Sequence, residues 1–392
     1  MEKAIGIKAL PDVIYVMGGG RWARIIIDVL FRITPSSVLI KVFTPRNSKN
    51  MQLWVEENKF EQRVKVETGE PEKLNDKHTV AIVVNRVNDH EQAIRKVINV
   101  CSQVIVEKPF TNSFAISNDL YNMANKNGVT ISTAHVFLFA SYFEQFSKLV
   151  LKAGKINYIL FDWSDPKSET RYSENKQYDS SLPIFADWLP HILSMTDRMV
   201  PQAKIVVNDV TINRGGATTE IKLLINEVIC MIKLNRNADE RVRKIFVSSE
   251  TGDLDLDFSM EPGKIKINDS ETLELVKWGF EERPLPSMLK AFLTGSTTNT
   301  FDERLDCRIA LLSNEVIDSV TAKYRVKQRN WLLGELDEFK SVDEDLKYAL
   351  TELFQIDHYL ETKEINTKLD ALENGTYKSN DLKKLVQQLN NN

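Results

Sequence analysis

A glycine-rich stretch near the start of the chain is the first feature with chemical meaning. From position 14 the sequence reads IYVMGGGRWAR, a short apolar run followed by three glycines. Gly18, Gly20 and Ala23 have the spacing G-x-G-x-x-G/A between an expected strand and an expected helix. The first glycine permits a tight turn, the second permits close approach of a pyrophosphate, and alanine still allows close helix packing. Because amides at a helix N-terminus stabilise phosphate charge, the loop predicts a dinucleotide site.

The stretch after the second expected strand bears on which dinucleotide binds. It reads VFTPRNSKN and contains no Asp or Glu to accept hydrogen bonds from the ribose 2′-hydroxyl of NAD. Thr44, Arg46, Asn47 and Lys49 instead offer hydroxyl, amide and cationic groups that suit a 2′-phosphate, which Arg can bind bidentately. A solvated basic loop is the alternative interpretation. The pattern favours NADP(H) and leaves NAD(H) open.

Two further motifs carry groups that could do chemistry. The run VIVEKPFTNS places Glu107 and Lys108 just beyond a short apolar strand, where ligands of open α/β sheets bind. The run PIFADWLPHILSM places Asp187 and His191 four residues apart, on one face of a helix. Hydride transfer at a carbinol carbon needs a histidine-like group for the hydroxyl proton and benefits from a cation at the developing alkoxide. The alternative is a solvated loop lysine and an ordinary helix-surface pair.

The elements that must position these residues follow from hydrophobic periodicity. Strands alternating with amphipathic helices predict a parallel, doubly wound Rossmann sheet over residues 1–135. From Ile156 long alternating runs predict a second domain, residues 136–325, with a large and mostly antiparallel sheet. A charged, helical C-terminal extension is expected over residues 326–392. The strands expected in the first domain are 13–17, 38–43, 79–85, 104–106 and 129–133.

Composition excludes several classes of function. The 392 residues include 51 basic and 55 acidic side chains, mixed along the chain with a formal net charge of −4, which disfavours nucleic acid as a partner. No leader pattern and no run of ~20 apolar residues is present, so we expect a cytoplasmic protein without a membrane partner. Cys101, Cys230 and Cys307 form no Cys-x-x-Cys pair, and no ligand cluster has metal spacing. We therefore expect neither disulfides nor a metal.

The order of these motifs resembles that of a known family. The glycine loop, Glu-Lys-Pro after the fifth strand and Asp-x-x-x-His in the second domain resemble the glucose-fructose oxidoreductase, inositol dehydrogenase and MocA (Gfo/Idh/MocA) oxidoreductases, over residues 10 to about 325. By this resemblance Lys108 would lie beside the nicotinamide and the reacting carbon. Asp187 would orient the substrate, and His191 would exchange a proton with the substrate oxygen. The C-terminal extension is not a usual part of the family.

The resemblance also extends the set of candidate site residues. VNRVNDH and AHVFLFASYF look like two loops of the family, which would bring Asn85 near the cofactor and His135 near the substrate. Catalysis is expected from Lys108, His191 and Asp187, and substrate binding from His135, Asp187 and His191. Cofactor contacts are expected from Gly18, Gly20, Arg21, Trp22, Ala23, Thr44, Arg46, Asn47, Asn85, Glu107 and Lys108.

The function implied by the resemblance is that of an NADP(H)-dependent oxidoreductase. Its substrate would be the hydroxyl or keto carbon of a sugar, cyclitol or related polar metabolite. One alternative is a reductase of carbon-nitrogen double bonds on the same scaffold. Another is a non-catalytic nucleotide sensor, against which the presence of both Lys108 and His191 argues. The family and the exposed face of the second-domain sheet predict a homo-oligomer formed through that sheet.

Overall fold

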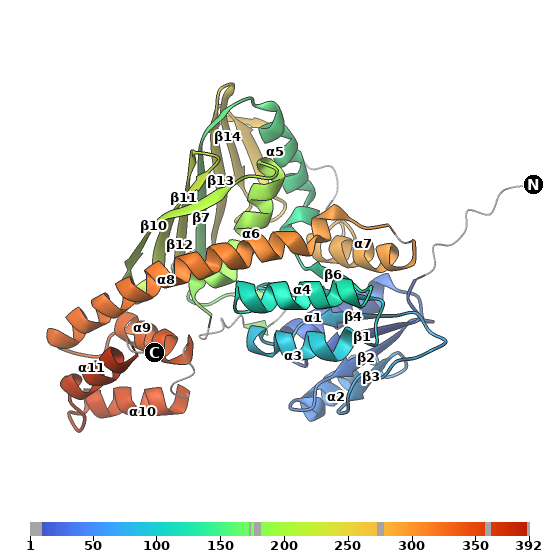
Figure 1. Ribbon diagram of the computed structural model, residues 1–392, viewed down its shortest axis with the longest axis horizontal. Helices are drawn as coiled ribbons and strands as arrows, with labels where there is room; N and C mark the ends of the chain where they lie inside the picture. Colours follow the sequence, from blue (N-terminus) through green and yellow to red (C-terminus); the bar gives the residue numbers. More distant parts are fainter. Residues whose placement is uncertain are drawn as a thin grey trace, which may run out of the picture. The chain divides into compact units, whose positions relative to one another are not determined.

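The computed structural model describes residues 10–171, 174–175, 182–272, 278–298, 300–356 and 362–389. The chain divides into two compact units, which are described separately (Figure 1). The first unit comprises Met1–Ser147, Leu193–Arg198 and Leu275–Glu315. The second comprises Lys148–Ile192, Met199–Glu274 and Val316–Asn392.

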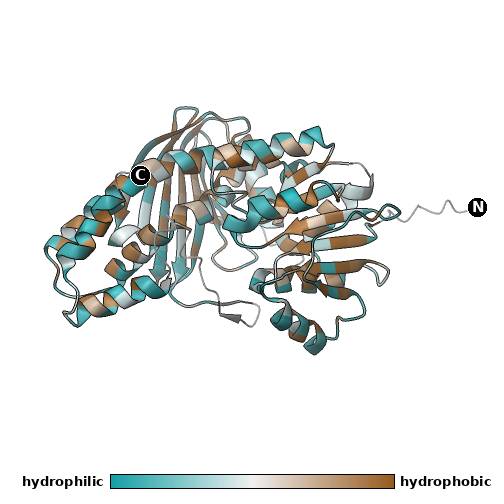
Figure 2. Cartoon of the chain, turned by 60° about the horizontal axis from the view of Figure 1, so that its bottom comes forward, coloured by the Kyte–Doolittle hydropathy of each residue, from teal (hydrophilic) through white to brown (hydrophobic). Residues whose placement is uncertain are grey.

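The first unit contains a parallel sheet of six strands in the order β3-β2-β1-β4-β5-β6. This is the strand order of a dinucleotide-binding doubly wound sheet, and it confirms the predicted Rossmann fold. The expected strands are all present, with ends within two residues of the expected ones, and β3 at the sheet edge is an additional strand. The strands are mostly apolar (Figure 2), because helices cover both faces of such a sheet. Their bounds are β1 Val13–Met17, β2 Leu39–Phe43, β3 Val64–Glu67, β4 Thr79–Val83, β5 Gln103–Val106 and β6 Thr130–Thr133.

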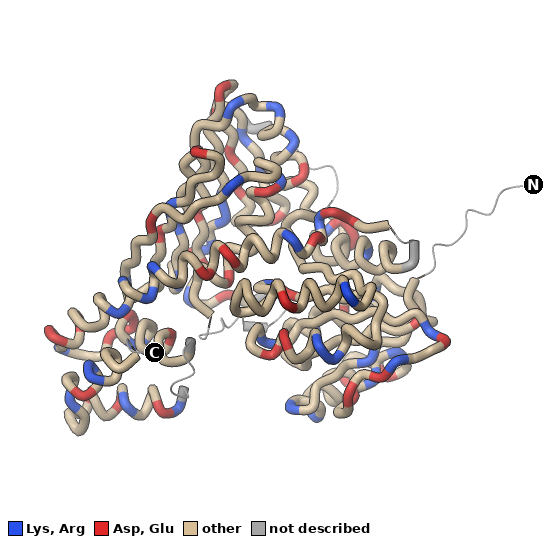
Figure 3. The backbone as a smooth tube through the Cα atoms, in the orientation of Figure 1, with Lys and Arg blue, Asp and Glu red and all other residues tan. Residues whose placement is uncertain are grey.

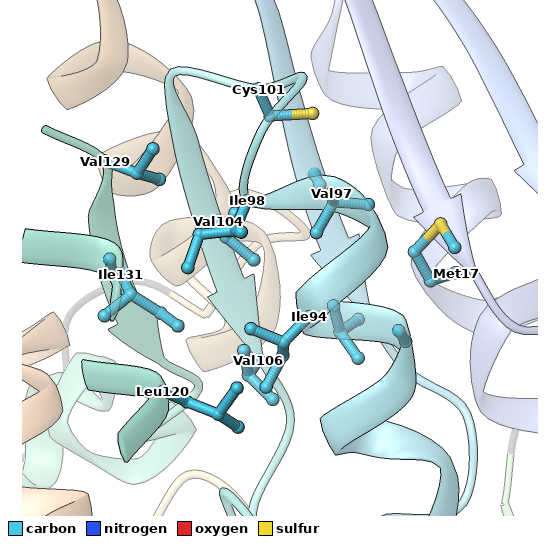
Figure 4. Close-up of a cluster of buried hydrophobic side chains, with 14 of the residues drawn as sticks. Met17, Ile94, Val97, Ile98, Cys101, Val104, Val106, Leu120, Val129 and Ile131 are labelled. Carbon is cyan, nitrogen blue, oxygen red and sulfur yellow. The ribbon is translucent and has the colours of Figure 1, made fainter. Parts of the chain in front are cut away.

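Helices of the first unit bury one apolar side each and carry charges on the other. Figure 3 shows acidic and basic residues along α3 and α4, and Figure 4 shows apolar side chains such as Ile94, Val104 and Leu120 packed between these helices and the sheet. The helices are α1 Arg21–Ile33, α2 Ser48–Glu57, α3 Val87–Val97, α4 Phe114–Lys126 and α7 Pro284–Thr298, with short 3-10 turns η1 Val136–Phe139 and η3 Glu303–Leu305.

The second unit contains a sheet of eight strands in the order β10-β11-β12-β7-β13-β14-β15-β16. Strands β7 and β12 pair in parallel, and the other neighbours are antiparallel, which confirms the predicted mostly antiparallel sheet. The bounds are β7 Ile156–Pro166, β10 Ile205–Asn213, β11 Thr218–Ile225, β12 Val228–Ala238, β13 Val242–Ser249, β14 Gly252–Asp257, β15 Lys264–Ile267 and β16 Ser270–Thr272. A short hairpin pairs β8 Thr170–Arg171 with β9 Glu174–Asn175.

Three helices contribute residues to both units, and three more lie within the predicted helical extension. The shared helices are α5 Ser141–Lys152, α6 Ile184–Met199 and α8 Cys307–Asp337. The extension expected over residues 326–392 contains the end of α8, followed by α9 Glu344–Ile356, α10 Thr362–Glu373 and α11 Ser379–Gln388. It has its own core of buried residues, among them Leu350, Phe354, Ile365, Leu369 and Leu382.

The helices and the cysteines bear on two of the expectations from the sequence. Among the described residues, no helix is long and apolar enough to cross a membrane. The three cysteines are buried and not joined in disulfides.

Candidate functional site

The glycine loop after β1 has little space on one side and open space on the other. Gly18 has φ +139°, and a Cβ atom there would lie 2.9 Å from the backbone nitrogen of Asn85. A Cβ atom at Gly19 would overlap the side chain of Thr44. At Gly20, by contrast, no described atom other than those of the glycine and its two chain neighbours lies within 4 Å of an added Cβ. The loop therefore packs against the ends of β2 and β4, while its second motif glycine faces open space.

Helix α1 begins at this open space, and its N-cap residue is a glycine that provides no side-chain cap. Gly20 is this N-cap, and the first turn of this fully described helix has no acidic residue. The amides of a helix N-terminus and the helix dipole favour an anion at this end. The space that a Cβ at Gly20 would fill is where a pyrophosphate needs close approach to the backbone. These residues fit the phosphate groups of a dinucleotide, with Arg21, Trp22 and Ala23 in the first turn.

The loop after β2 lies against the glycine loop. The Asn47 side-chain amide donates a hydrogen bond to the carbonyl of Gly19 at 2.5 Å, and Thr44 is buried beside it. The side chain of Arg46 is 86% exposed, and its Nη1 lies 3.5 Å from the Asp89 carboxylate. Asp89 was not anticipated from the sequence. It places an anion next to the cation that we expect to contact a 2′-phosphate.

A hydrogen bond joins the glycine loop to the Glu-Lys-Pro motif. The indole nitrogen of Trp22 donates to the Glu107 carboxylate at 2.7 Å, so the first turn of α1 is tied to the end of β5. Lys108 follows directly, half-buried, and is joined to Pro109 by a cis peptide bond. The ends of β1 and β5 thus bring the glycine loop and a lysine to the same edge of the parallel sheet.

His90 ties two of these loops together, a role that the motifs did not indicate. Its Nδ1 lies 3.1 and 3.2 Å from the carbonyls of Pro109 and Phe110, and its Nε2 lies 3.0 Å from the carbonyl of Asn85. Burial lowers the pKa of His90 more than these carbonyls raise it. The signal that could have found it is helical spacing, because His90 lies on the buried face of α3 with Val87, Ala93, Ile94 and Val97.

His135 follows β6 in the first unit and is fully buried. Neither ring nitrogen has a hydrogen-bond partner among the described residues. Burial lowers its pKa to about 4, although Asp306 acts in the opposite direction. A buried polar ring without protein partners calls for an explanation such as a water or a ligand, which suits the substrate-binding role expected from the sequence.

In the second unit, α6 carries Asp187 and His191 one turn apart. His191 is buried, and its ring lies 5.7 Å from that of Trp188, measured between centroids. The Asp187 carboxylate is 21% exposed and lies 3.6 Å from Nη2 of Arg236, a buried residue of β12. Arg236 was missed by sequence reasoning. The alternation of β12 could have revealed it, because Arg236 shares the buried face with Ile232 and Leu234.

A second buried arginine holds α6 against the sheet. The Trp188 indole donates to the Asp165 carboxylate of β7 at 2.9 Å, and Arg243 of β13 donates to the same carboxylate at 2.5 Å. The Arg243 guanidinium lies 4.2 Å from the Trp188 ring centroid and 5.1 Å from that of Trp163. Burial lowers the pKa of Arg243 to about 10, against the effect of Asp165. The helix with the candidate catalytic pair is therefore held to the sheet through Trp188, by its hydrogen bond to Asp165 and its ring contact with the Arg243 guanidinium.

The predicted site residues thus form two groups. The cofactor set, with Lys108 and His135, belongs to the first unit, and Asp187 with His191 belongs to the second. Among the described residues, no group of three or more His, Cys, Asp or Glu side chains could hold a metal ion.

Comparison with known proteins bears on the first group. Residues 13–135 match the model of the oxidoreductase family with an NAD-binding Rossmann fold (GFO_IDH_MocA). Human biliverdin reductase A is 29% identical over 93 residues, which are 24% of this chain and 31% of that protein. The oxidoreductase YhhX of Escherichia coli is 29% identical over 106 residues, which are 26% of this chain and 30% of that protein. The matches therefore span less than a third of either relative.

Solved structures resemble much more of the chain. A UDP-N-acetylglucosamine 3-dehydrogenase from Acidithiobacillus ferrooxidans has a TM-score of 0.64 at 13% identity, covering 82% of this chain and 100% of that chain. A 3-ketoreductase from Actinomadura kijaniata, solved with TDP-benzene and NADP, has a TM-score of 0.65 at 14% identity, covering 80% of this chain and 98% of that chain. At such identities the likeness shows the fold alone. The family match at residues 13–135 confirms the resemblance of the motifs for the first domain: these residues form an NAD-binding Rossmann domain of the Gfo/Idh/MocA oxidoreductase family.

Proposed function

We propose that the protein is an NADP(H)-dependent oxidoreductase that transfers a hydride to or from a hydroxyl or keto carbon of a sugar, cyclitol or related polar metabolite. The proposal rests on the arrangement of residues at the edge of the parallel sheet where the strands end. There a helix N-terminus without a side-chain cap faces open space at Gly20 and is joined through Trp22 and Glu107 to Lys108. The nicotinamide of the bound cofactor would supply or accept the hydride.

The chain's own residues have separate roles in this proposal. Lys108 supplies a cation and a hydrogen-bond donor to the substrate oxygen. His191 exchanges a proton with that oxygen at its ring nitrogen. Asp187 accepts a hydrogen bond from the substrate while Arg236 holds its carboxylate. His135 contributes the polar ring that has no partner among the described residues.

The substrate class is supported by the solved structures of similar fold. One of them is named as a dehydrogenase of UDP-N-acetylglucosamine and another as a 3-ketoreductase. Nucleotide-linked sugars are therefore the first candidates. NADP(H) is favoured because residues 44–50 contain no carboxylate. Thr44 and Asn47 contact the glycine loop, and Arg46 is exposed between them in the sequence.

The proposal includes a homo-oligomer formed through the sheet of the second unit. Two neighbouring cross-strand rows on one face of this sheet are apolar and partly exposed. A face of this kind is typical of a surface that packs against a second copy. We call it the apolar sheet patch; it consists of Val206, Leu224, Ile229 and Tyr158 in one row and Met231, Leu160 and Phe246 in the next.

The test is a substrate screen with matched variants. Purified protein with NADPH or NADP⁺ is offered nucleotide-linked sugars, free sugars, cyclitols, cyclic imines and biliverdin, and cofactor absorbance is followed. With the substrate found, Lys108→Ala and His191→Ala should each lower turnover by about a hundredfold or more. Cofactor affinity should change much less. Lys126→Ala, at an exposed lysine of α4, is the control.

The outcomes separate the alternatives. Rates within a few fold of wild type for both variants would remove the catalytic assignment. Turnover of imines alone would favour the carbon-nitrogen reductase. Tight NADPH binding with no turnover of any class would favour the nucleotide sensor.

A further inference from the structure

Within the second unit, helices α8 and α9 pack closely against a turn of the sheet at two glycines. The short turn η2, Arg214–Gly216, lies between β10 and β11. Gly215 has φ +64°, and a Cβ atom there would lie 2.6 Å from Cβ of Ala349 in α9. Gly216 has φ +106°, and a Cβ atom there would overlap the hydroxyl of Tyr324 in α8. Arg214 also pairs with Asp345 at 3.2 Å. Helix α9 therefore has a defined place in this unit.

A buried carboxylate on α9 is surrounded by hydroxyl and amide donors. Glu352 is 1% exposed and accepts hydrogen bonds from Tyr324, from Tyr348 at 2.5 Å and from Gln328 at 2.8 Å. The donors come from both α8 and α9. Burial raises the pKa of Glu352 more than these hydrogen bonds and nearby Arg236 lower it. An acid placed so far from water needs a cationic partner nearby if it is to be charged.

That partner is Arg236, which lies between two carboxylates. Its Nη1 donates to the carbonyl of Leu182 at 3.0 Å and to the Tyr348 hydroxyl at 3.5 Å, and that hydroxyl donates onward to Glu352. Its Nη2 lies 3.6 Å from the Asp187 carboxylate. Burial lowers the pKa of Arg236, but Tyr348, Asp187, Glu352 and, more weakly, Asp165 outweigh it and leave the pKa raised. The guanidinium is thus a permanent charge between the carboxyl groups of Asp187 and Glu352.

From this arrangement we infer that Glu352 is a positioning residue of the active site, which acts through Tyr348 and Arg236 to set the place of the Asp187 carboxylate on α6. The C-terminal helices are then part of the catalytic apparatus although they contribute no group that touches the substrate. The inference rests on the proposed function, in which Asp187 and His191 act on the substrate.

The physical reason is charge balance in a buried cluster. With Glu352 neutral, Arg236 would lose one of its anions and would attract the Asp187 carboxylate more strongly, away from the substrate. The cluster next to α6 would also carry one negative charge fewer. A histidine near such a cluster becomes less basic, because its protonated form loses electrostatic stabilisation.

The first experiment measures this effect without any substrate. Full-length protein labelled at the histidine Cε1 is titrated by NMR, and the His191 resonance is identified by its loss in His191→Asn. In Glu352→Gln the midpoint of His191 should fall by about half a pH unit or more. The matched control is Glu344→Gln on the same helix, where the carboxylate is 72% exposed and pairs with Lys167 at the surface. It should leave the titration unchanged.

A second variant keeps the test decisive if Glu352→Gln fails to fold. Tyr348→Phe retains the ring and removes the hydroxyl between Arg236 and Glu352, and it should move the His191 midpoint in the same direction by a smaller amount. A His191 titration equal to wild type in every folded variant of Glu352 and Tyr348 overturns the inference.

Measurements of turnover distinguish a failure of this inference from a failure of the proposed function. With the substrate found in the screen, Glu352→Gln should lower kcat about tenfold or more with unchanged NADPH affinity, and Glu352→Asp should recover part of the loss. Wild-type rates in Lys108→Ala and His191→Ala would refute the proposed function, and the NMR titration would then decide the inference by itself. Large losses in those variants together with wild-type kcat and titration in Glu352→Gln would refute the inference alone.

Discussion

At the scale of single residues, Gly18 and Gly20 illustrate two different demands for glycine. A Cβ atom at Gly20 would enter the open space at the N-terminus of α1. Gly20→Ala should therefore lower the unfolding temperature only slightly, as alanine is a poorer N-cap than glycine. It should weaken NADPH binding by about tenfold or more, roughly 1.4 kcal/mol, because the methyl group would keep the pyrophosphate from the backbone. Fluorescence titration and calorimetry measure the two quantities.

Gly18→Ala is the matched comparison. Its φ of +139° and the backbone nitrogen of Asn85 at 2.9 Å leave an alanine strained. We expect a loss of stability of about 1–3 kcal/mol, seen as a lower unfolding temperature. Equal unfolding temperatures for the two variants would contradict the distinction between a structural and a ligand-facing glycine.

Arg46 should set the choice of cofactor. We expect NADPH to bind about tenfold more tightly than NADH, and Arg46→Ala should remove most of that difference, because the guanidinium can bind a 2′-phosphate bidentately. Asp89→Asn should widen the preference, since it removes the anion 3.5 Å from Arg46. Arg32→Ala, at an exposed arginine of α1 paired with Asp28, is the control. Equal affinity of the wild type for both cofactors would overturn the prediction.

His135 should make stability depend on pH. Its pKa is about 4 in the folded protein, below the ordinary value near ~6.5 of an unfolded chain. The unfolded state therefore binds a proton that the folded state excludes, and stability should fall as the pH drops from about 6.5 to 4, by up to about 3 kcal/mol. His90 adds to the same trend.

Calorimetry across this pH range tests the effect. His135→Leu should flatten the dependence of unfolding temperature on pH, whereas His78→Gln, at a half-exposed ring, should remove less of it. The same slope in wild type and His135→Leu would count against the assignment.

At the scale of elements, the position of α6 depends on the strands beneath it. Trp188→Phe keeps an aromatic ring over Arg243 but leaves the buried Asp165 without its indole donor. We expect a loss of stability of about 1–3 kcal/mol, measured as a lower unfolding temperature. Trp54→Phe, at a half-exposed tryptophan of α2, is the control and should change it less. Equal effects would argue that the hydrogen bond contributes nothing.

At the scale of the whole molecule, the apolar sheet patch predicts association. Light scattering at micromolar concentration should show an oligomer, and Ile229→Lys should shift it toward monomer, because a charge placed within the patch would be costly to bury. Lys233→Ala, on the charged part of the same face, should not have this effect. A wild-type monomer at all concentrations would remove the oligomer from the proposal.

Much of the fold and part of the site could be predicted from local patterns. Strands β1, β4 and β5 are buried runs of apolar residues, and the spacing of Gly18, Gly20 and Ala23 expresses a local backbone requirement. Strand β3 was not predicted, since its four residues VKVE at the sheet edge are mostly not buried and carry little apolar signal. Local sequence thus determined which elements form and which loops end the strands.

Only the tertiary structure decided the partners of the buried polar groups. His90 meets the carbonyls after β5, Arg236 meets Asp187 on α6, and Tyr348 on α9 joins Arg236 to Glu352. The last two connections cross tens to more than a hundred residues of chain. Such pairings depend on strand register and helix docking, which spacing along the chain does not encode. The low dielectric of the interior strengthens the interactions between these buried polar and charged groups.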